Sequence, residues 1–155
     1  MAEARARRNK LNEAFYAAKD ELEKAKKKVD AAEMSIAVAE NQLEQTKQAV
    51  KSLTKTKNDQ DESVRKTCNV QCRGKDKKKC VKRPPCKAAK RRRSNAEKNR
   101  MAKVTQKDKQ IANLKKLREN KKQLLKTVKK KEAALTKAKT NRSKGIVDFI
   151  SDLKF

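Results

Sequence analysis

Uncharged residues recur at alternating spacings of four and three from Leu11 to Leu53. This spacing keeps apolar side chains on one helix face, as in the seam of a coiled coil. Large residues alternate with mostly alanine, so a partner helix could approach closely. The pattern predicts a long heptad helix over residues 1–67. Its seam residues are Leu11, Phe15, Leu22, Val29, Ile36, Leu43, Val50 and Leu53, with Ala18, Ala25, Ala32, Ala39 and Thr46 between them.

A second long, basic helix is expected over residues 94–144, with Ser94 or Asn95 as its cap. Its pattern is less regular, which predicts a stutter or a broad apolar stripe. One heptad frame contains Val104, Ile111, Leu114, Leu125, Val128 and Leu135. The charged residues Arg118, Lys121 and Glu132 interrupt this frame. Leu117 and Leu124 fit a neighbouring frame. We interpret this helix as the partner of the first.

The interior breakers are Gly74 and the pair Pro84-Pro85. A helix is not expected to continue through Pro84, because proline lacks the amide donor and clashes with the preceding turn. Two arms of similar length around a central turn favour an all-α, long antiparallel helical hairpin with coiled-coil packing. Residues 68–93 would form its basic, cysteine-containing tip and the start of the second helix.

Residues 145–155 form a short apolar segment after Gly145, which is expected to stop the helix. Ile146, Phe149, Ile150 and Leu153 make an amphipathic stripe, which predicts a short C-terminal helix. That helix would close over Leu11, Phe15 and Tyr16, or would contact another subunit. Self-association through the first heptad is a further expectation.

The four cysteines, Cys68, Cys72, Cys80 and Cys86, have the spacing C-x3-C-x7-C-x5-C. Nested disulfides, Cys72 with Cys80 and Cys68 with Cys86, fit a chain that turns back near its midpoint, although four cysteines allow three connectivities. Zinc held by four thiolates and free thiols are the alternatives. Zinc sites usually have C-x2-C pairs, which are missing here. We therefore expect no cofactor, with zinc as the minority alternative.

The first cysteine pair and the helix-loop-helix layout resemble the small chaperones of the mitochondrial intermembrane space, which have twin C-x3-C motifs. The second pair here is C-x5-C and contains prolines, and both arms are far longer. Bridged cysteines would indicate an oxidising compartment or a virion, whereas free thiols would indicate the nucleus.

Charge is the dominant compositional feature, with a formal net charge of +27 and 3% aromatic residues. Residues 1–67 carry 15 basic and 12 acidic side chains, a net of +3; residues 68–93 carry 12 and 1, a net of +11; residues 94–155 carry 19 and 6, a net of +13. This asymmetry favours a polyanionic partner, either nucleic acid or an acidic protein. The chain has no histidine, no glycine-rich phosphate loop and no paired carboxylates on an apolar background, so we expect no enzyme. No apolar run is long enough for a membrane span, so no membrane partner is expected.

The candidate polyanion-binding side chains lie in two neighbouring basic stretches. They are Arg73, Lys77, Lys78, Lys79, Lys82, Arg83, Lys90, Arg91, Arg92, Arg93, Lys98, Arg100 and Lys103. Contacts from such residues to phosphates would be salt-dependent and largely independent of sequence. No aromatic residue lies nearby to stack on bases.

Part of this stretch resembles the basic region of basic-leucine-zipper factors. Arg91-Arg92-Arg93 and the run Asn99 to Ala102 match that family's arginine cluster and its Asn-x-x-Ala. Lys103 stands where a second alanine would follow, and Lys107 where an arginine would lie. The resemblance implies a dimer that reads DNA sequence.

The sequence thus predicts a non-enzymatic structural or scaffold protein of a larger assembly, virion-like or filament-like, whose polycationic arm contacts nucleic acid or another polyanion. A purely structural coiled-coil rod bound to acidic protein neighbours is one alternative. A basic-leucine-zipper-like DNA-binding dimer is another.

Overall fold

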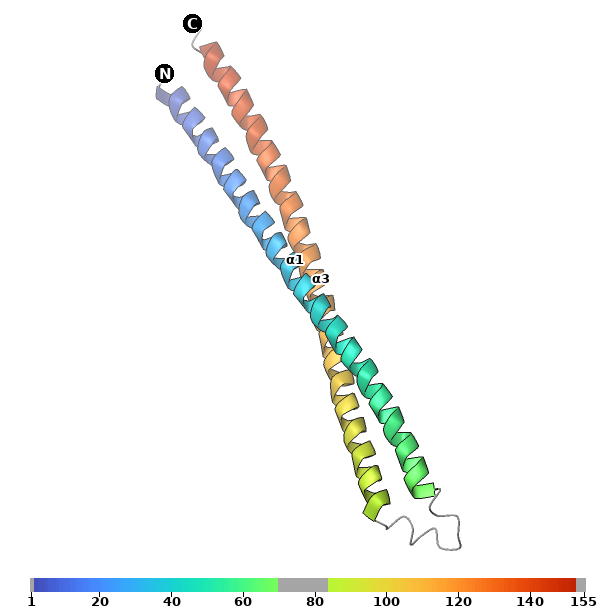
Figure 1. Cartoon of the computed structure of the whole chain (residues 1–155). Coiled ribbons are helices and arrows are strands. Elements are labelled where there is room, and N and C mark those ends of the chain that lie inside the picture. Colours follow the sequence, from blue (N-terminus) through green and yellow to red (C-terminus); the bar gives the residue numbers. More distant parts are fainter. Residues whose placement is uncertain (1, 70–83, 153–155) are drawn as a thin grey trace. The chain divides into compact units, whose positions relative to one another are not determined.

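The computed structural model describes residues 2–69 and 84–152, and these are helical throughout (Figure 1). Helix α1 spans Ala2–Val64, a π-helical turn η1 spans Arg65–Asn69, and helix α3 spans Pro84–Asp152. The described ranges contain no strand, which confirms the all-α prediction. Within them, no helix is apolar enough over a sufficient length to cross a membrane.

Helix α3 begins at Pro84, within the segment 68–93 that was predicted to contain its start, but ten residues before Ser94, so the predicted cap at Ser94 or Asn95 is wrong. Pro84 and Pro85 occupy its first turn. Proline is tolerated there because the amide that it lacks would have no partner inside the helix. The prolines therefore start this helix instead of delaying it.

Helix α3 also continues through Gly145 to Asp152, so the described residues contain no separate C-terminal helix. A side chain at position 145 would collide with Leu11, which suits glycine to this close approach. Ile146 and Ile150 remain 38% and 48% exposed, and Tyr16 is 58% exposed. Of the predicted closure over Leu11, Phe15 and Tyr16, the described residues therefore show that Ile146, Ile150 and Tyr16 stay largely exposed. Leu153, Phe155 and the side chain of Phe149 lie outside the described part.

The chain divides into two compact units. Unit 1 contains Met1–Ala37 and Lys115–Phe155. Its core consists of Leu22, Ala25, Val29 and Val128, against which Leu124 and Leu135 pack. The two helical segments run antiparallel, because residues with higher numbers in α1 contact residues with lower numbers in α3. Contacts that show this are Phe15 with Arg142, Lys26 with Glu132, and Glu33 with Lys121.

Unit 2 contains Val38–Leu114. Its two helical segments also run antiparallel, since Asp61 pairs with Arg93 and, further along, Cys68 is bonded to Cys86. Cys68 and Cys86 are buried, with Cα atoms 5.1 Å apart. This disulfide confirms one of the two predicted bridges. Gly74, Cys72 and Cys80, with the predicted tip around them, lie outside the described residues.

The predicted seam of α1 is the least exposed line of that helix. Leu22, Val29 and Leu43 are buried. Leu11, Phe15, Ile36, Val50 and Leu53 are half-buried.

The predicted frame of α3 is matched at Val104, Ile111, Leu114, Val128 and Leu135, which are buried or half-buried, but not at Leu125. Buried or half-buried positions recur at uninterrupted spacings of four and three, without a stutter. They are Ala96, Arg100, Lys103, Lys107, Gln110, Leu114, Leu117, Lys121, Leu124, Val128, Lys131, Leu135, Ala138 and Arg142. Leu125, assigned to the seam by its hydrophobicity, is 42% exposed. Lysine and arginine fit such positions because their methylene stems cover apolar surface while the charged ends reach water.

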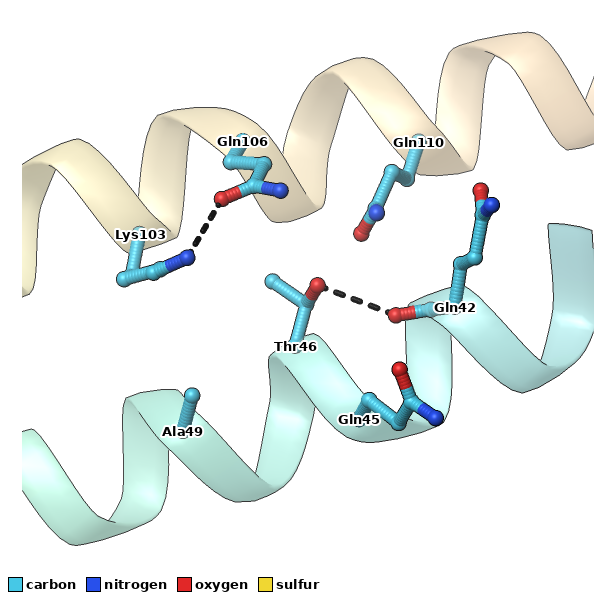
Figure 2. A pocket seen from close by; sticks show the side chains of 7 residues that line it. All are labelled: Gln42, Gln45, Thr46, Ala49, Lys103, Gln106 and Gln110. Carbon is cyan, nitrogen blue, oxygen red and sulfur yellow. Dashed lines mark hydrogen bonds between the residues drawn. The ribbon is translucent and has the colours of Figure 1, made fainter.

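A polar layer interrupts the apolar packing of unit 2 (Figure 2). Thr46 is buried, and its hydroxyl donates to the carbonyl of Gln42 at 2.9 Å. Around it lies a cavity of about 420 Å³, lined by Gln42, Gln45, Thr46, Ala49, Lys103, Gln106 and Gln110. Gln110 Oε1 is buried there without a hydrogen-bond partner among the described groups. The layer therefore includes an amide whose acceptor is unsatisfied by protein.

Gln110→Leu is expected to raise the free energy of unfolding by about 1–2 kcal/mol, because it removes a buried unpaired acceptor and adds apolar contact. Urea unfolding followed by circular dichroism measures the difference. Gln106→Leu is the matched control: Gln106 is exposed and accepts from Lys103 Nζ at 2.9 Å, so no gain is expected. A loss of stability in Gln110→Leu would show that water or another group satisfies this amide.

Candidate polyanion-binding surface

The structure describes seven of the thirteen predicted polyanion-binding residues. Lys90, Arg91, Arg92, Arg93, Lys98, Arg100 and Lys103 lie on the first turns of α3, all within unit 2. Arg73, Lys77, Lys78, Lys79, Lys82 and Arg83 lie outside the described residues. The candidate site is therefore built from the described part of the predicted set.

Three of the seven residues are already engaged within the chain. Arg93 Nε lies 2.5 Å from Asp61 Oδ1 on α1. Arg100 donates to both oxygens of Glu97, at 3.0 and 2.7 Å. Lys103 Nζ donates to Gln106. Arg93 and Arg100 therefore contribute less free positive charge than a count of basic residues suggests, whereas Lys103 keeps its charge because Gln106 is neutral.

The carboxylates in this network are stabilised in their ionised form. A hydrogen bond from Lys57 Nζ holds the pKa of Asp61 below its usual value, and the charge of Arg93 acts in the same direction against partial desolvation. The hydrogen bonds from Arg100 similarly lower the pKa of Glu97. Both carboxylates stay charged at neutral pH and are matched by neighbouring cations.

The other four predicted residues, Lys90, Arg91, Arg92 and Lys98, are exposed and have no carboxylate partner among the described residues. Lys87, which the sequence reasoning did not select, has the same environment. Helical spacing places Lys87, Arg91 and Lys98 on one line along the side of α3 that faces away from the seam. This line is about 16 Å long at 1.5 Å per residue, which is enough to contact several successive phosphates.

An open groove of about 650 Å³ runs beside this line. It is lined by Lys57, Lys90, Arg93, Ser94, Glu97 and Lys98. Lys57 comes from α1, and the sequence signal for it was a break in the apolar seam at that position. Since Arg100 binds both oxygens of Glu97, the groove has an excess of positive charge, which suits an anionic group such as a phosphate.

Two further predicted features concern metal binding and base recognition. Cys68 and Cys86 are bonded to each other, so their sulfurs are not available as thiolate ligands for zinc. The described ranges contain no group of three or more metal-ligating side chains. Asn99, the candidate base-reading residue, is exposed on α3, whereas Lys103 lines the polar cavity of unit 2.

Comparison with protein families, characterised proteins and solved structures finds no significant match.

Proposed function

We propose that this chain is a non-enzymatic structural protein of a larger assembly, and that the exposed cations of α3 bind nucleic acid. The proposal includes the finer architecture predicted from the sequence, an antiparallel coiled-coil hairpin with the cysteine segment at its tip. In this view the paired helices are a scaffold that holds positive charge in a fixed arrangement.

The observation that supports the proposal is a division among the basic residues of α3. The cations of its seam have partners: Lys121 pairs with Glu33 at 2.8 Å, Lys131 pairs with Glu21, and Arg142 lies 4.9 Å from the centre of the Phe15 ring. Fifteen others are exposed without a carboxylate partner among the described residues. These are Lys87, Lys90, Arg91, Arg92, Lys98, Lys109, Lys115, Lys116, Lys122, Lys126, Lys129, Lys130, Lys137, Lys139 and Lys144.

Helix α1 does not supply the missing negative charge. Several of its carboxylates pair with lysines one turn away on the same helix, as in Asp20 with Lys24, Glu23 with Lys27, and Glu62 with Lys66. The outward charges of α3 therefore repel one another in the isolated chain. A polyanion would relieve this repulsion and would release its own condensed counterions on binding.

Nucleic-acid binding is tested by replacing five outward cations of unit 2, Lys87, Lys90, Arg91, Arg92 and Lys98, with glutamine. The control replaces five exposed lysines of α1, Lys10, Lys19, Lys28, Lys51 and Lys55, which changes the net charge equally. Affinity for a 30-base-pair duplex is measured across NaCl concentrations. The slope of log K against log salt should become less steep by up to about 4 in the test variant, at about 0.9 per lost phosphate contact, and by less than 1 in the control.

Two results would contradict the proposal. The first is no binding of the duplex by the unmodified chain at low salt. The second is equal weakening in the test and control variants, which would mean that net charge alone is responsible. Preferential binding of poly-glutamate over the duplex would instead favour a rod among acidic protein neighbours.

A further inference from the structure

Helix α3 carries a second cationic surface, within unit 1, that the sequence analysis did not single out. We call it the lysine face. It consists of seven exposed lysines: Lys115, Lys116, Lys122, Lys129, Lys130, Lys137 and Lys144. It begins about a dozen residues beyond Lys103, the last residue of the predicted polyanion-binding set, and so forms a separate site.

The seven lysines fall into two rows along the helix. Lys115, Lys122 and Lys129 form one row, with steps of seven residues. Lys116, Lys130, Lys137 and Lys144 form the other, at multiples of seven. The rows lie about 100° apart around the helix axis, one on each side of the line opposite the seam. Together they extend over about 44 Å at 1.5 Å per residue.

One flank of the same segment carries Arg118, Glu132 and Lys139, and the other flank is uncharged. Asn120, Thr127, Ala134 and Asn141 occupy it at steps of seven residues. A surface that needed charge only for solubility would not require lysines to gather on one face. Their concentration there is what a binding surface requires.

No lysine of this face has a carboxylate partner among the described residues. Three acidic groups of unit 1 are engaged elsewhere: Glu21 by Lys131, Glu33 by Lys121, and Glu132 by Lys26 at 3.5 Å. Glu119, on α3 itself, accepts a hydrogen bond from Gln123 Nε2 at 2.9 Å. Two cations of the α3 seam, Lys121 and Lys131, thus take up carboxylates of α1. Seven exposed lysines against the single carboxylate of Glu119, which lies between the rows, leave the face strongly positive toward solvent.

We propose that the lysine face binds double-stranded nucleic acid through its phosphates. This assignment rests on the proposed function and narrows it to one class of nucleic acid and one second site. The face contains no arginine for bidentate contacts to bases, so its lysines act as point charges. The described aromatic rings of unit 1, Phe15 and Tyr16, lie against Arg142 and belong to α1, so the face itself offers no ring for base stacking.

A surface that supplies charge alone favours the ligand with the highest charge density. A duplex carries one charge per about 1.7 Å of its axis, whereas a single strand carries about half as many. Each neutralised phosphate also releases more counterion from a duplex than from a single strand. The salt slope is about 0.9 per contact for a duplex and about 0.7 per contact for a single strand. A single strand would recover this difference only by stacking on aromatic side chains, which the face lacks.

The test uses the full chain with Lys115, Lys122, Lys129, Lys130 and Lys137 replaced by glutamine, and the α1 variant described above as the control of equal charge. Glutamine keeps the helix propensity and the length of the side chain close to those of lysine. Circular dichroism checks that helicity is retained. The probes are a 30-base-pair duplex, a 30-nucleotide single strand and poly-glutamate, each titrated across NaCl concentrations.

For the duplex, we expect the salt slope to become less steep by about 3–4 in the lysine-face variant and by less than 1 in the control. The unmodified chain should bind the duplex at least tenfold more tightly than either other probe. If the salt slope for duplex binding is the same in the lysine-face variant as in the α1 control variant, the lysine face is not a binding site. Equal or tighter binding of the single strand or of poly-glutamate would overturn the choice of duplex.

These results separate the second site from the proposed function. If the unit 2 variant loses salt-dependent duplex binding while the lysine-face variant does not, the proposed function stands and the second site fails. If the unmodified chain binds no nucleic acid, both fail.

Discussion

Breaking the Cys68–Cys86 bond is expected to lower the free energy of unfolding by about 3 kcal/mol. The bond joins residues 18 positions apart, and a closed loop of this length removes about that much conformational freedom from the unfolded chain. Both cysteines are buried next to the start of α3, so the bond also keeps this helix end beside η1. Without it, the ends of the two helices near the central segment should fray first.

The bond is best isolated in a Cys72→Ala, Cys80→Ala background, where Cys68–Cys86 is the sole possible intrachain bridge. Urea unfolding of the oxidised and reduced forms then compares identical side chains, and intact mass after alkylation confirms the thiol state. A difference below about 1 kcal/mol would contradict the expected contribution. Alkylation of both thiols in the air-oxidised protein would contradict the bond itself.

Leu124→Ala is expected to destabilise the chain by about 2 kcal/mol, whereas Leu125→Ala should cost less than about 0.5 kcal/mol. Leu124 packs against the core of unit 1, while its neighbour is 42% exposed. Truncating a packed leucine loses apolar burial and leaves a cavity, and truncating an exposed one does neither. The value for Leu124 lies at the low end for leucine because this side chain is only half-buried.

The two variants form a matched pair, since they make the same change at adjacent positions of one helix. Thermal and urea unfolding at equal protein concentration give both values. Similar losses in the two variants, or a larger loss in Leu125→Ala, would show that the seam of α3 follows the frame expected from hydrophobicity instead of the one in the structure. The experiment thus tests the helix register independently of any function.

The polar layer around Thr46 modifies a simple view of the seam. Thr46 alone is a mild polar interruption, but the structure adds Gln110, with a buried acceptor, from the facing helix. Buried polar layers of this type usually lower stability and restrict the registers in which two helices can pair. The expected gain in stability on Gln110→Leu follows from the same cost.

The fold class could be predicted because its signals are local. The regular apolar spacing from Leu11 to Leu53, with no glycine or proline before Gly74, is sufficient for a long α1. The asymmetry of charge between the two helices is likewise written in the composition. Cys68 with Cys86 could be predicted because a chain that turns near its midpoint brings these two positions level with each other.

The predictions failed where a side chain has two roles. Lys121 is predicted to interrupt the seam because lysine is charged, yet it is half-buried there and pairs with Glu33. Lys131 is likewise half-buried in the seam and pairs with Glu21. Leu125 was read as a seam residue because leucine is apolar, yet it is exposed. Hydrophobicity describes a side chain by one value, whereas a lysine buries its stem and exposes its charged end.

The candidate site shows the same limit. The sequence shows where the basic residues of this stretch lie. It does not show that Arg93 and Arg100 are paired with carboxylates, whereas Arg91 and Lys98 are not. It also passed over the lysine face, because those residues are spread across 30 positions and gather only when the helix is formed.

By itself, the sequence determined that the chain is helical, that α1 has a heptad seam, and that positive charge is concentrated after it. These properties follow from the spacing and composition of residues along the sequence. Only the tertiary structure decided which cations are neutralised, which heptad frame α3 uses, and how Gly145 is accommodated against Leu11. Each of these features depends on which residue of the facing helix lies opposite a given position. That spatial relation cannot be read from any single position of the sequence.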